Sequence, residues 1–261
     1  MPAFAEWTAA ASLCPAADYR PPPVASRHDL RHSLRDCLRL PVIAEIFTWP
    51  NVLAALTVIM AGVVRGFTGF GSALLMVPIL ALLWTPTQAV TTAFGVGIVA
   101  SLQLVPKAAT QANWREIGPM AAATVLVTPL GTMILLGIEP AIMRRIIAAL
   151  ILIVTLVFLR GWQYRGPRGT GPGFVAGATG AVINGVAGVG GPAVVLYILS
   201  LPDPVAIQRA NIVVQISLMG FVGLVYLALA EVVGREDLIR IGALALPMML
   251  GTTIGSQLFL R

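Results

Sequence analysis

Arg65 is the only charged side chain that lies well inside a long apolar stretch of the chain. The residues that follow it, 66–106, contain no Asp, Glu, Lys or Arg. A charge in the middle of a membrane-spanning segment is costly and usually serves a function. The guanidinium offers a planar fork of N–H donors, which matches two oxygens of an oxyanion. Arg65 is therefore a candidate anion ligand, and snorkelling to an interface or pairing with a carbonyl is the alternative.

Two glycine-rich stretches carry a similar pattern in the two halves of the chain. The first, Gly66-Phe-Thr-Gly-Phe-Gly71, follows Arg65, and the second, Gly185-Val-Ala-Gly-Val-Gly-Gly-Pro192, follows Asn184. Glycine weakens a helix, and proline suits the first turn of a new one. Each stretch therefore predicts a helix, an unwound segment and a second helix. Such a break leaves N–H groups free, and the restarting helix directs its positive dipole end toward it.

Two breaks of this kind could face each other and form a single anion site near the middle of the membrane. The alternative is that the glycines only permit close packing of helices. The candidate substrate-binding residues are Arg65, Gly66, Thr68, Gly69, Gly71, Ser72, Asn184, Gly185, Gly188, Gly190, Gly191 and Pro192.

Other polar side chains in the apolar segments are weaker candidates for anion binding. Asn184 takes the place of Arg65 in the second half and could donate an amide hydrogen. For Gln103, Asn211 and Gln215, hydrogen bonding between helices is the simpler role.

The two halves match at a nearly constant spacing. An offset of 119 residues pairs Gly66 with Gly185, and an offset of 120 pairs Gly131 with Gly251. Matching order at a fixed offset predicts an internal duplication, which is common in transporters. The first half continues past Gly131 into one more apolar segment, whereas the chain stops shortly after Gly251. We therefore expect the last span of the second half to be missing, by truncation or naturally.

The composition predicts a membrane protein. Hydrophobic residues make up 57% of the chain and charged residues only 11%, whereas soluble domains carry roughly 25% charged residues. A helix of about 20 apolar residues crosses a bilayer core. Long apolar segments occur near 51–84, 88–106, 117–137, 141–159, 173–201, 210–230 and 238–260. The predicted fold class is an all-α integral membrane protein: a polytopic helical bundle of two homologous halves, each with a glycine-broken helix, with about 7–8 spans.

The chain divides into a basic N-terminal tail (1–45), a first transmembrane repeat (46–160), a basic cytoplasmic linker (161–172) and a second, incomplete repeat (173–261). Trp49, Trp84, Trp114 and Trp162 fall at the predicted membrane ends, where indole rings are favoured. If each broken element crosses once and the tail is cytoplasmic, Lys and Arg number 12 inside and 4 outside. Separate crossings for the two halves of each broken element give 9 against 7. The positive-inside rule favours the first arrangement.

Several classes of function are disfavoured. The net charge of +6 comes from tail arginines and from residues that flank apolar segments, which is the positive-inside pattern rather than a nucleic-acid groove. Cys14 and Cys37 lie in the tail without metal-ligand spacing. Acidic and histidine side chains are missing from the middle of the spans, so general acid–base catalysis lacks its usual groups. We expect no enzymatic activity, no cofactor and no metal site, and the lack of internal carboxylates weighs against a cation as the cargo.

The paired glycine motifs at 66–71 and 185–192, within this hydropathy profile, resemble those of the sulfite exporter TauE/SafE family. The resemblance covers about residues 50–261. It implies a multi-pass secondary transporter of small sulfur-containing anions, such as sulfite, sulfoacetate or another organosulfonate, in the cytoplasmic membrane. The chain departs from the motif at Ser72, where the second motif has Gly191, and in the missing span.

The alternative function is a permease or channel for another small anion or metabolite. The expected partners are a small anionic substrate and the lipid bilayer, without nucleic acid. The sequence leaves the oligomeric state open.

Overall fold

The computed structural model describes residues 49–161 and 164–260, so the predicted basic tail and Trp162 lie outside the described residues. Every regular element among these residues is a helix, which confirms the predicted fold class. The helices are α3 (Trp49–Thr68), α4 (Ser72–Leu83), α5 (Pro86–Gln111), α6 (Trp114–Gly137), α7 (Pro140–Leu159), α8 (Thr170–Ala187), α9 (Gly191–Ile198), α10 (Val205–Leu229) and α11 (Arg235–Leu260).

Six of these helices, namely α3, α5, α6, α7, α10 and α11, are long and apolar enough to cross a membrane. The described residues thus give fewer full-length spans than the 7–8 expected. The difference lies in the two glycine-broken segments. Glycine lowers the hydropathy of α8, and α4 and α9 are only 12 and 8 residues long.

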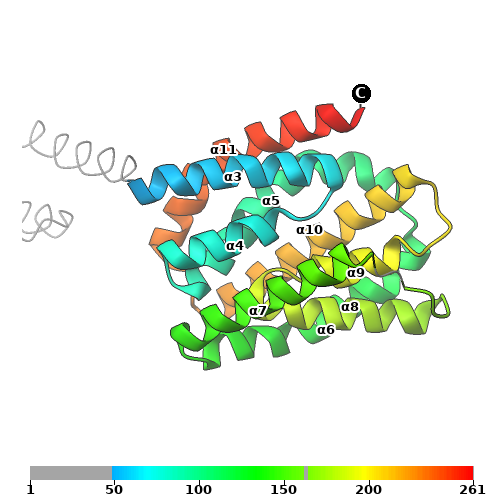
Figure 1. The fold of residues 1–261 in the computed structure, drawn as a ribbon, viewed down its shortest axis with the longest axis horizontal. Coiled ribbons are helices and arrows are strands. Elements are labelled where there is room, and N and C mark those ends of the chain that lie inside the picture. Colours follow the sequence, from blue (N-terminus) through cyan, green and yellow to red (C-terminus); the bar gives the residue numbers. More distant parts are fainter. Residues whose placement is uncertain (1–48, 162–163, 261) are drawn as a thin grey trace, which may run out of the picture. The chain divides into compact units, whose positions relative to one another are not determined.

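Both predicted breaks are present, but the helices that follow them turn back (Figure 1). The hydroxyl of Tyr197 near the end of α9 lies 3.2 Å from the carbonyl oxygen of Gly169, just before α8, so α9 runs antiparallel to α8. α4 likewise returns alongside α3 (Figure 1). The expected single crossing by each broken element is therefore wrong, and each element is a helical hairpin.

The physical reason for the hairpins is the backbone conformation of the glycines. Gly69 and Gly71 have φ of 86° and 88°, and Gly188 has φ of 69°. Side-chain-bearing residues rarely adopt these angles, and they reverse the chain direction rather than simply unwinding it. Because each hairpin returns to the side on which it starts, its two helices count as separate crossings. Lys and Arg then number 9 on one side of the membrane and 7 on the other, not 12 and 4.

The second half repeats the first in the opposite direction. The order hairpin, long helix, long helix occurs as α3–α4, α5, α6 and again as α8–α9, α10, α11. In Figure 1, α8 runs opposite to α3, α10 opposite to α5, and α11 opposite to α6. This is an inverted repeat, which in transporters places the substrate site between the halves. α7 has no counterpart in the described part of the second half.

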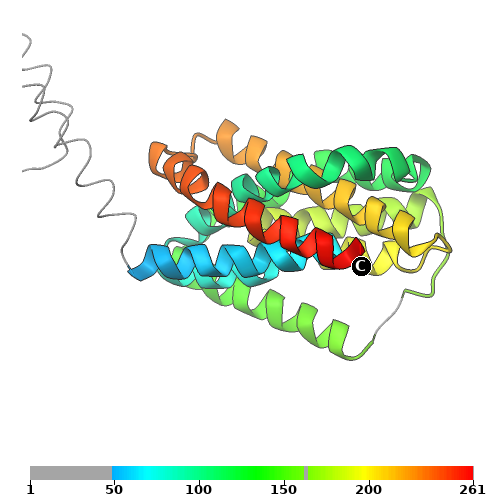
Figure 2. The same cartoon turned by 90° about the horizontal axis from the view of Figure 1, so that it is seen from above.

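Glycines hold each hairpin against the other half. A Cβ atom on Gly185 of α8 would lie 2.7 Å from the Cα of Gly131 of α6, and one on Gly66 of α3 would lie 3.0 Å from the Cα of Gly255 of α11. α11 accordingly lies along α3 (Figure 2). Contacts this close are typical of small-residue helix interfaces in membranes. The two hairpins are thus anchored crosswise, each by the other repeat.

α5 and α10 form the centre of the bundle and pack against each other. In the apolar 18-residue stretch of α5, 67% of the residues are buried, whereas in that of α7 only 11% are buried. α7 therefore lies at the periphery and α5 in the interior. The start of α5 is fixed by a capping box: the backbone N–H of Gln88 donates to the Thr85 hydroxyl oxygen, and the backbone N–H of Thr85 donates to Gln88 Oε1.

Candidate anion site

A cavity of about 40 Å³ lies where the tips of the two hairpins meet. Its walls come from the start of α4, the turn between α8 and α9, and the middle of α5 and α10. Gly97 and Ser217, which line the cavity, lie near the middle of helices 26 and 25 residues long. The cavity is therefore about halfway along the spans, where irregular backbone is tolerated only if protein or a water-filled space surrounds it.

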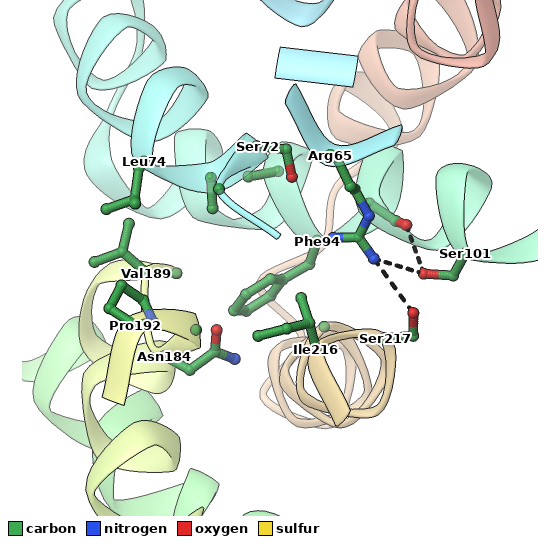
Figure 3. A pocket seen from close by; sticks show the side chains of 17 residues that line it. Arg65, Ser72, Leu74, Phe94, Ser101, Asn184, Val189, Pro192, Ile216 and Ser217 are labelled. Atoms are coloured by element: carbon green, nitrogen blue, oxygen red, sulfur yellow. Dashed lines mark hydrogen bonds between the residues drawn. The ribbon is translucent and has the colours of Figure 1, made fainter. Parts of the chain in front are cut away.

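Arg65 brings a single positive charge to this cavity (Figure 3). Its side chain is buried, and Nη2 donates hydrogen bonds to Ser101 Oγ at 2.9 Å and to Ser217 Oγ at 3.3 Å. Nε is buried and donates to no group of the described chain. Both ion pairs among the described residues belong to Arg240, so none of the carboxylates described neutralises Arg65. The snorkelling alternative is excluded by this burial.

The backbone at the hairpin tips adds further donors. The N-caps of α4 and α9, Gly71 and Gly190, make no side-chain capping hydrogen bond. In the described part of the chain, the N–H groups of Ser72, Ala73 and Gly191 have no backbone acceptor. A buried N–H without an acceptor is costly, and the start of a helix favours negative charge. The tips therefore present unused donors beside a lone cation.

The cavity brings together seven of the predicted site residues. Those that line it are Arg65, Gly71, Ser72, Asn184, Gly188, Gly191 and Pro192. Asn184 lies across the cavity from Arg65 (Figure 3). One of its amide N–H groups already donates to Met219 O at 3.0 Å, so it ties α8 to α10 as well as lining the cavity.

The other five predicted residues do not line the cavity. Gly66 and Gly185 pack against α11 and α6, which is the packing role that the sequence left open. The Thr68 hydroxyl hydrogen-bonds to the backbone of Phe70 in the α3–α4 turn. Gly69 supplies a positive φ in that turn, and Gly190 is pressed against α8, where a Cβ would lie 2.6 Å from that of Asn184. These residues shape the hairpins and do not face the cavity.

Sequence reasoning missed the residues that α5 and α10 contribute. They are Ala93, Phe94, Gly97, Ser101, Ile216, Ser217 and Gly220. Gly97 and Ser101 stand one helical turn apart, and Ser101 Oγ donates to Gly97 O at 2.8 Å. Small residues with this spacing are common in membrane helices, so the sequence carried no signal that set these apart.

Two of the three polar residues assigned to helix contacts, Asn211 and Gln215, behave as expected. Asn211 and Gln215 are fully buried. Asn211 Oδ1 accepts the backbone N–H of Asn113, and Gln215 Nε2 donates to the hydroxyl of Thr124 at 2.9 Å. Gln103 is exposed. None of the three lines the cavity.

Arg209 occupies the negative end of α3, outside the cavity. Its guanidinium donates to Gly66 O at 2.6 Å and to Phe67 O at 3.1 Å, and it lies 4.1 Å from the centre of the Phe259 ring. The last carbonyls of a helix carry partial negative charge. Because Arg209 neutralises them, the α3–α4 hairpin presents chiefly its positive N–H groups to the cavity.

A family model for the sulfite exporter TauE/SafE family matches residues 54–261, which include both hairpins and both cavity-lining long helices. The chain belongs to the TauE/SafE family. No curated protein and no solved structure matched the chain. TauE/SafE is a transporter family, so the protein is a multi-pass membrane transporter. In this TauE/SafE protein, the family's paired glycine motifs form the tips of two opposed hairpins around one buried arginine.

Proposed function

We propose that this transporter exports sulfite, or a closely related sulfur oxyanion, across the cytoplasmic membrane and binds it at Arg65. The observation that carries the proposal is the buried Arg65 guanidinium, which has an unused Nε and no carboxylate partner among the described residues. An uncompensated buried charge costs several kcal/mol. A bound anion would supply both the missing charge and the missing hydrogen-bond acceptor.

The inverted repeat suggests how such a site would open to each side in turn. The positive ends of α4 and α9 come from opposite halves of the molecule and flank the same cavity. An anion between them would attract both tips at once. Movement of one repeat relative to the other would then expose the site to one face of the membrane and close it to the other. Sulfite and the lipid bilayer are the partners that this mechanism requires.

The test is flux of radiolabelled sulfite in proteoliposomes that contain the purified protein. Arg65→Gln keeps a polar side chain but removes the charge. Loss of charge-assisted hydrogen bonds, each worth roughly 1.5–3 kcal/mol, is expected to reduce flux at low sulfite by about tenfold or more. Arg65→Lys keeps the charge without the planar fork and is expected to retain part of the flux.

The matched control is Arg115→Gln, because Arg115 is an exposed cation at the start of α6 and far from the cavity lining. It is expected to transport sulfite as the wild type does. Folding of each variant is checked by gel filtration in detergent. Equal flux in the wild type and a folded Arg65→Gln variant would show that Arg65 has only a structural role.

A further inference from the structure

Phe94 divides the polar cavity. Its ring lies between Arg65 and Asn184 (Figure 3) and is only 4% exposed. A Cβ on Gly223 of α10 would lie 2.5 Å from Phe94 Cε2, and one on Gly188 would lie 3.7 Å from Cε1. The ring thus sits in a slot made of glycine backbone from both the α8–α9 turn and α10. Backbone yields less than a side chain, so Phe94 forms a fixed wall.

Ile216 forms a second apolar wall of the same cavity. It lies near Phe94 (Figure 3). A Cβ on Gly191 would lie 2.8 Å from Ile216 Cδ1, so the side chain already fills the space beside the start of α9. Phe94 and Ile216 are thus two large apolar side chains in the cavity that also holds the Arg65 guanidinium.

The space left between these walls is small. The free space is about 40 Å³, well below the roughly 150 Å³ of a cavity that holds benzene. Sulfite, a single sulfur with three oxygens, is smaller than benzene. Sulfoacetate carries an additional acetate arm and a second negative charge, and the cavity offers no second cation among its lining residues.

We propose that Phe94 and Ile216 set the size limit of the site, so that the protein takes compact oxyanions such as sulfite and rejects longer organosulfonates such as sulfoacetate. This inference rests on the proposed function and narrows its substrate class. It makes Phe94 and Ile216 specificity-determining residues, whereas Arg65 supplies the charge that any oxyanion would need. Replacing either residue by one with a smaller side chain is then expected to widen the range of anions that the site accepts.

The experiment measures how well unlabelled sulfoacetate competes with radiolabelled sulfite for entry into proteoliposomes. In the wild type, sulfoacetate is expected to compete at least about tenfold less well than sulfite, the discrimination expected from a few atoms in a packed pocket. In Phe94→Ala and Ile216→Ala, competition by sulfoacetate is expected to rise by about tenfold relative to sulfite. Phe94→Leu and Ile216→Val provide milder versions if the alanine variants do not fold.

Phe221→Ala is the matched control, since Phe221 lies on α10 near Ile216 but is 55% exposed and does not line the cavity. It is expected to keep the wild-type preference. Equal competition by sulfite and sulfoacetate in the wild type would overturn the size limit and leave the proposed function standing. Folded wall variants that still exclude sulfoacetate would overturn it as well. A wild type without sulfite flux would instead refute the proposed function itself.

Discussion

A substitution at Gly220 is expected to change the stability of the protein and its transport activity in opposite directions. Gly220 lines the cavity from α10, and a Cβ at this position would meet no atom within 4 Å. Alanine therefore fits without strain, and its methyl group would occupy free space of the cavity. Replacing glycine by alanine inside a helix stabilises it by about 0.8–1.0 kcal/mol in soluble hosts. Gly220→Ala is thus expected to stabilise the fold and yet to weaken the binding of the anion.

The expected size of the binding effect comes from the volume of the cavity. A methyl group is about as large as a water molecule, and the free space of the cavity is only about 40 Å³. The methyl therefore takes a substantial part of the space that the anion would fill. An anion that has to share this space with the methyl overfills the site, and overfilling typically costs about 1–3 kcal/mol. This corresponds to a sulfite affinity about 5- to 150-fold weaker.

The assay compares the concentration dependence of sulfite flux in proteoliposomes with thermal unfolding in detergent. Gly242→Ala is the control, because Gly242 lies in the interior of α11 and a Cβ there also meets open space, but away from the cavity. Both variants are expected to unfold at the wild-type temperature or slightly above it. Only Gly220→Ala is expected to require more sulfite for the same flux. A normal concentration dependence in that variant would mean that the anion does not pass through this cavity.

Three further substitutions test the supports of the site. Gly185→Ala places a methyl 2.7 Å from the Cα of Gly131 and is expected to cost about 1–3 kcal/mol, seen as a lower unfolding temperature; unchanged stability would contradict the tight α6–α8 packing. Arg209→Met uncovers the last carbonyls of α3 and is expected to lower sulfite flux as well as stability, and a variant with full flux would remove Arg209 from the account. Gly188→Ala forces a side chain into a φ of 69° at a cost of about 1–2 kcal/mol and is expected to reduce flux, whereas the same change at the exposed Gly161, with φ of 62°, tests the strain alone.

The sequence predicted the parts of the fold that depend on composition and local backbone chemistry. Long uncharged stretches specify membrane helices, and the glycines around Gly71 and Gly188 specify breaks. The direction of the chain after each break was mispredicted, because the reversal depends on the particular φ values at these glycines and on contacts such as that of Tyr197 with the start of α8. These contacts join residues far apart in the chain, and no local pattern encodes them.

In the candidate site too, the sequence predicted what local residue chemistry determines and missed what depends on contacts between distant residues. Arg65 could be recognised because a charge in an apolar span is conspicuous in any sequence. The motif glycines could be found in the sequence, but those that line the cavity could not be told from those that pack between helices. Gly71 faces the cavity, whereas Gly66 in the same motif packs against α11. Ser101 and Phe94 were missed because serine and phenylalanine are ordinary residues in membrane helices. Only the crossing of α5 and α10 turns them toward Arg65.

Anion binding at Arg65 is tested most directly by a crystal structure of the protein with selenite, the heavier homologue of sulfite, located by its anomalous scattering. We expect a selenium peak in the cavity between the starts of α4 and α9, within hydrogen-bonding distance of the Arg65 guanidinium, and loss of that peak in Arg65→Gln. A selenium peak elsewhere in the protein, or one that persists at full strength in the variant, would contradict anion binding at Arg65.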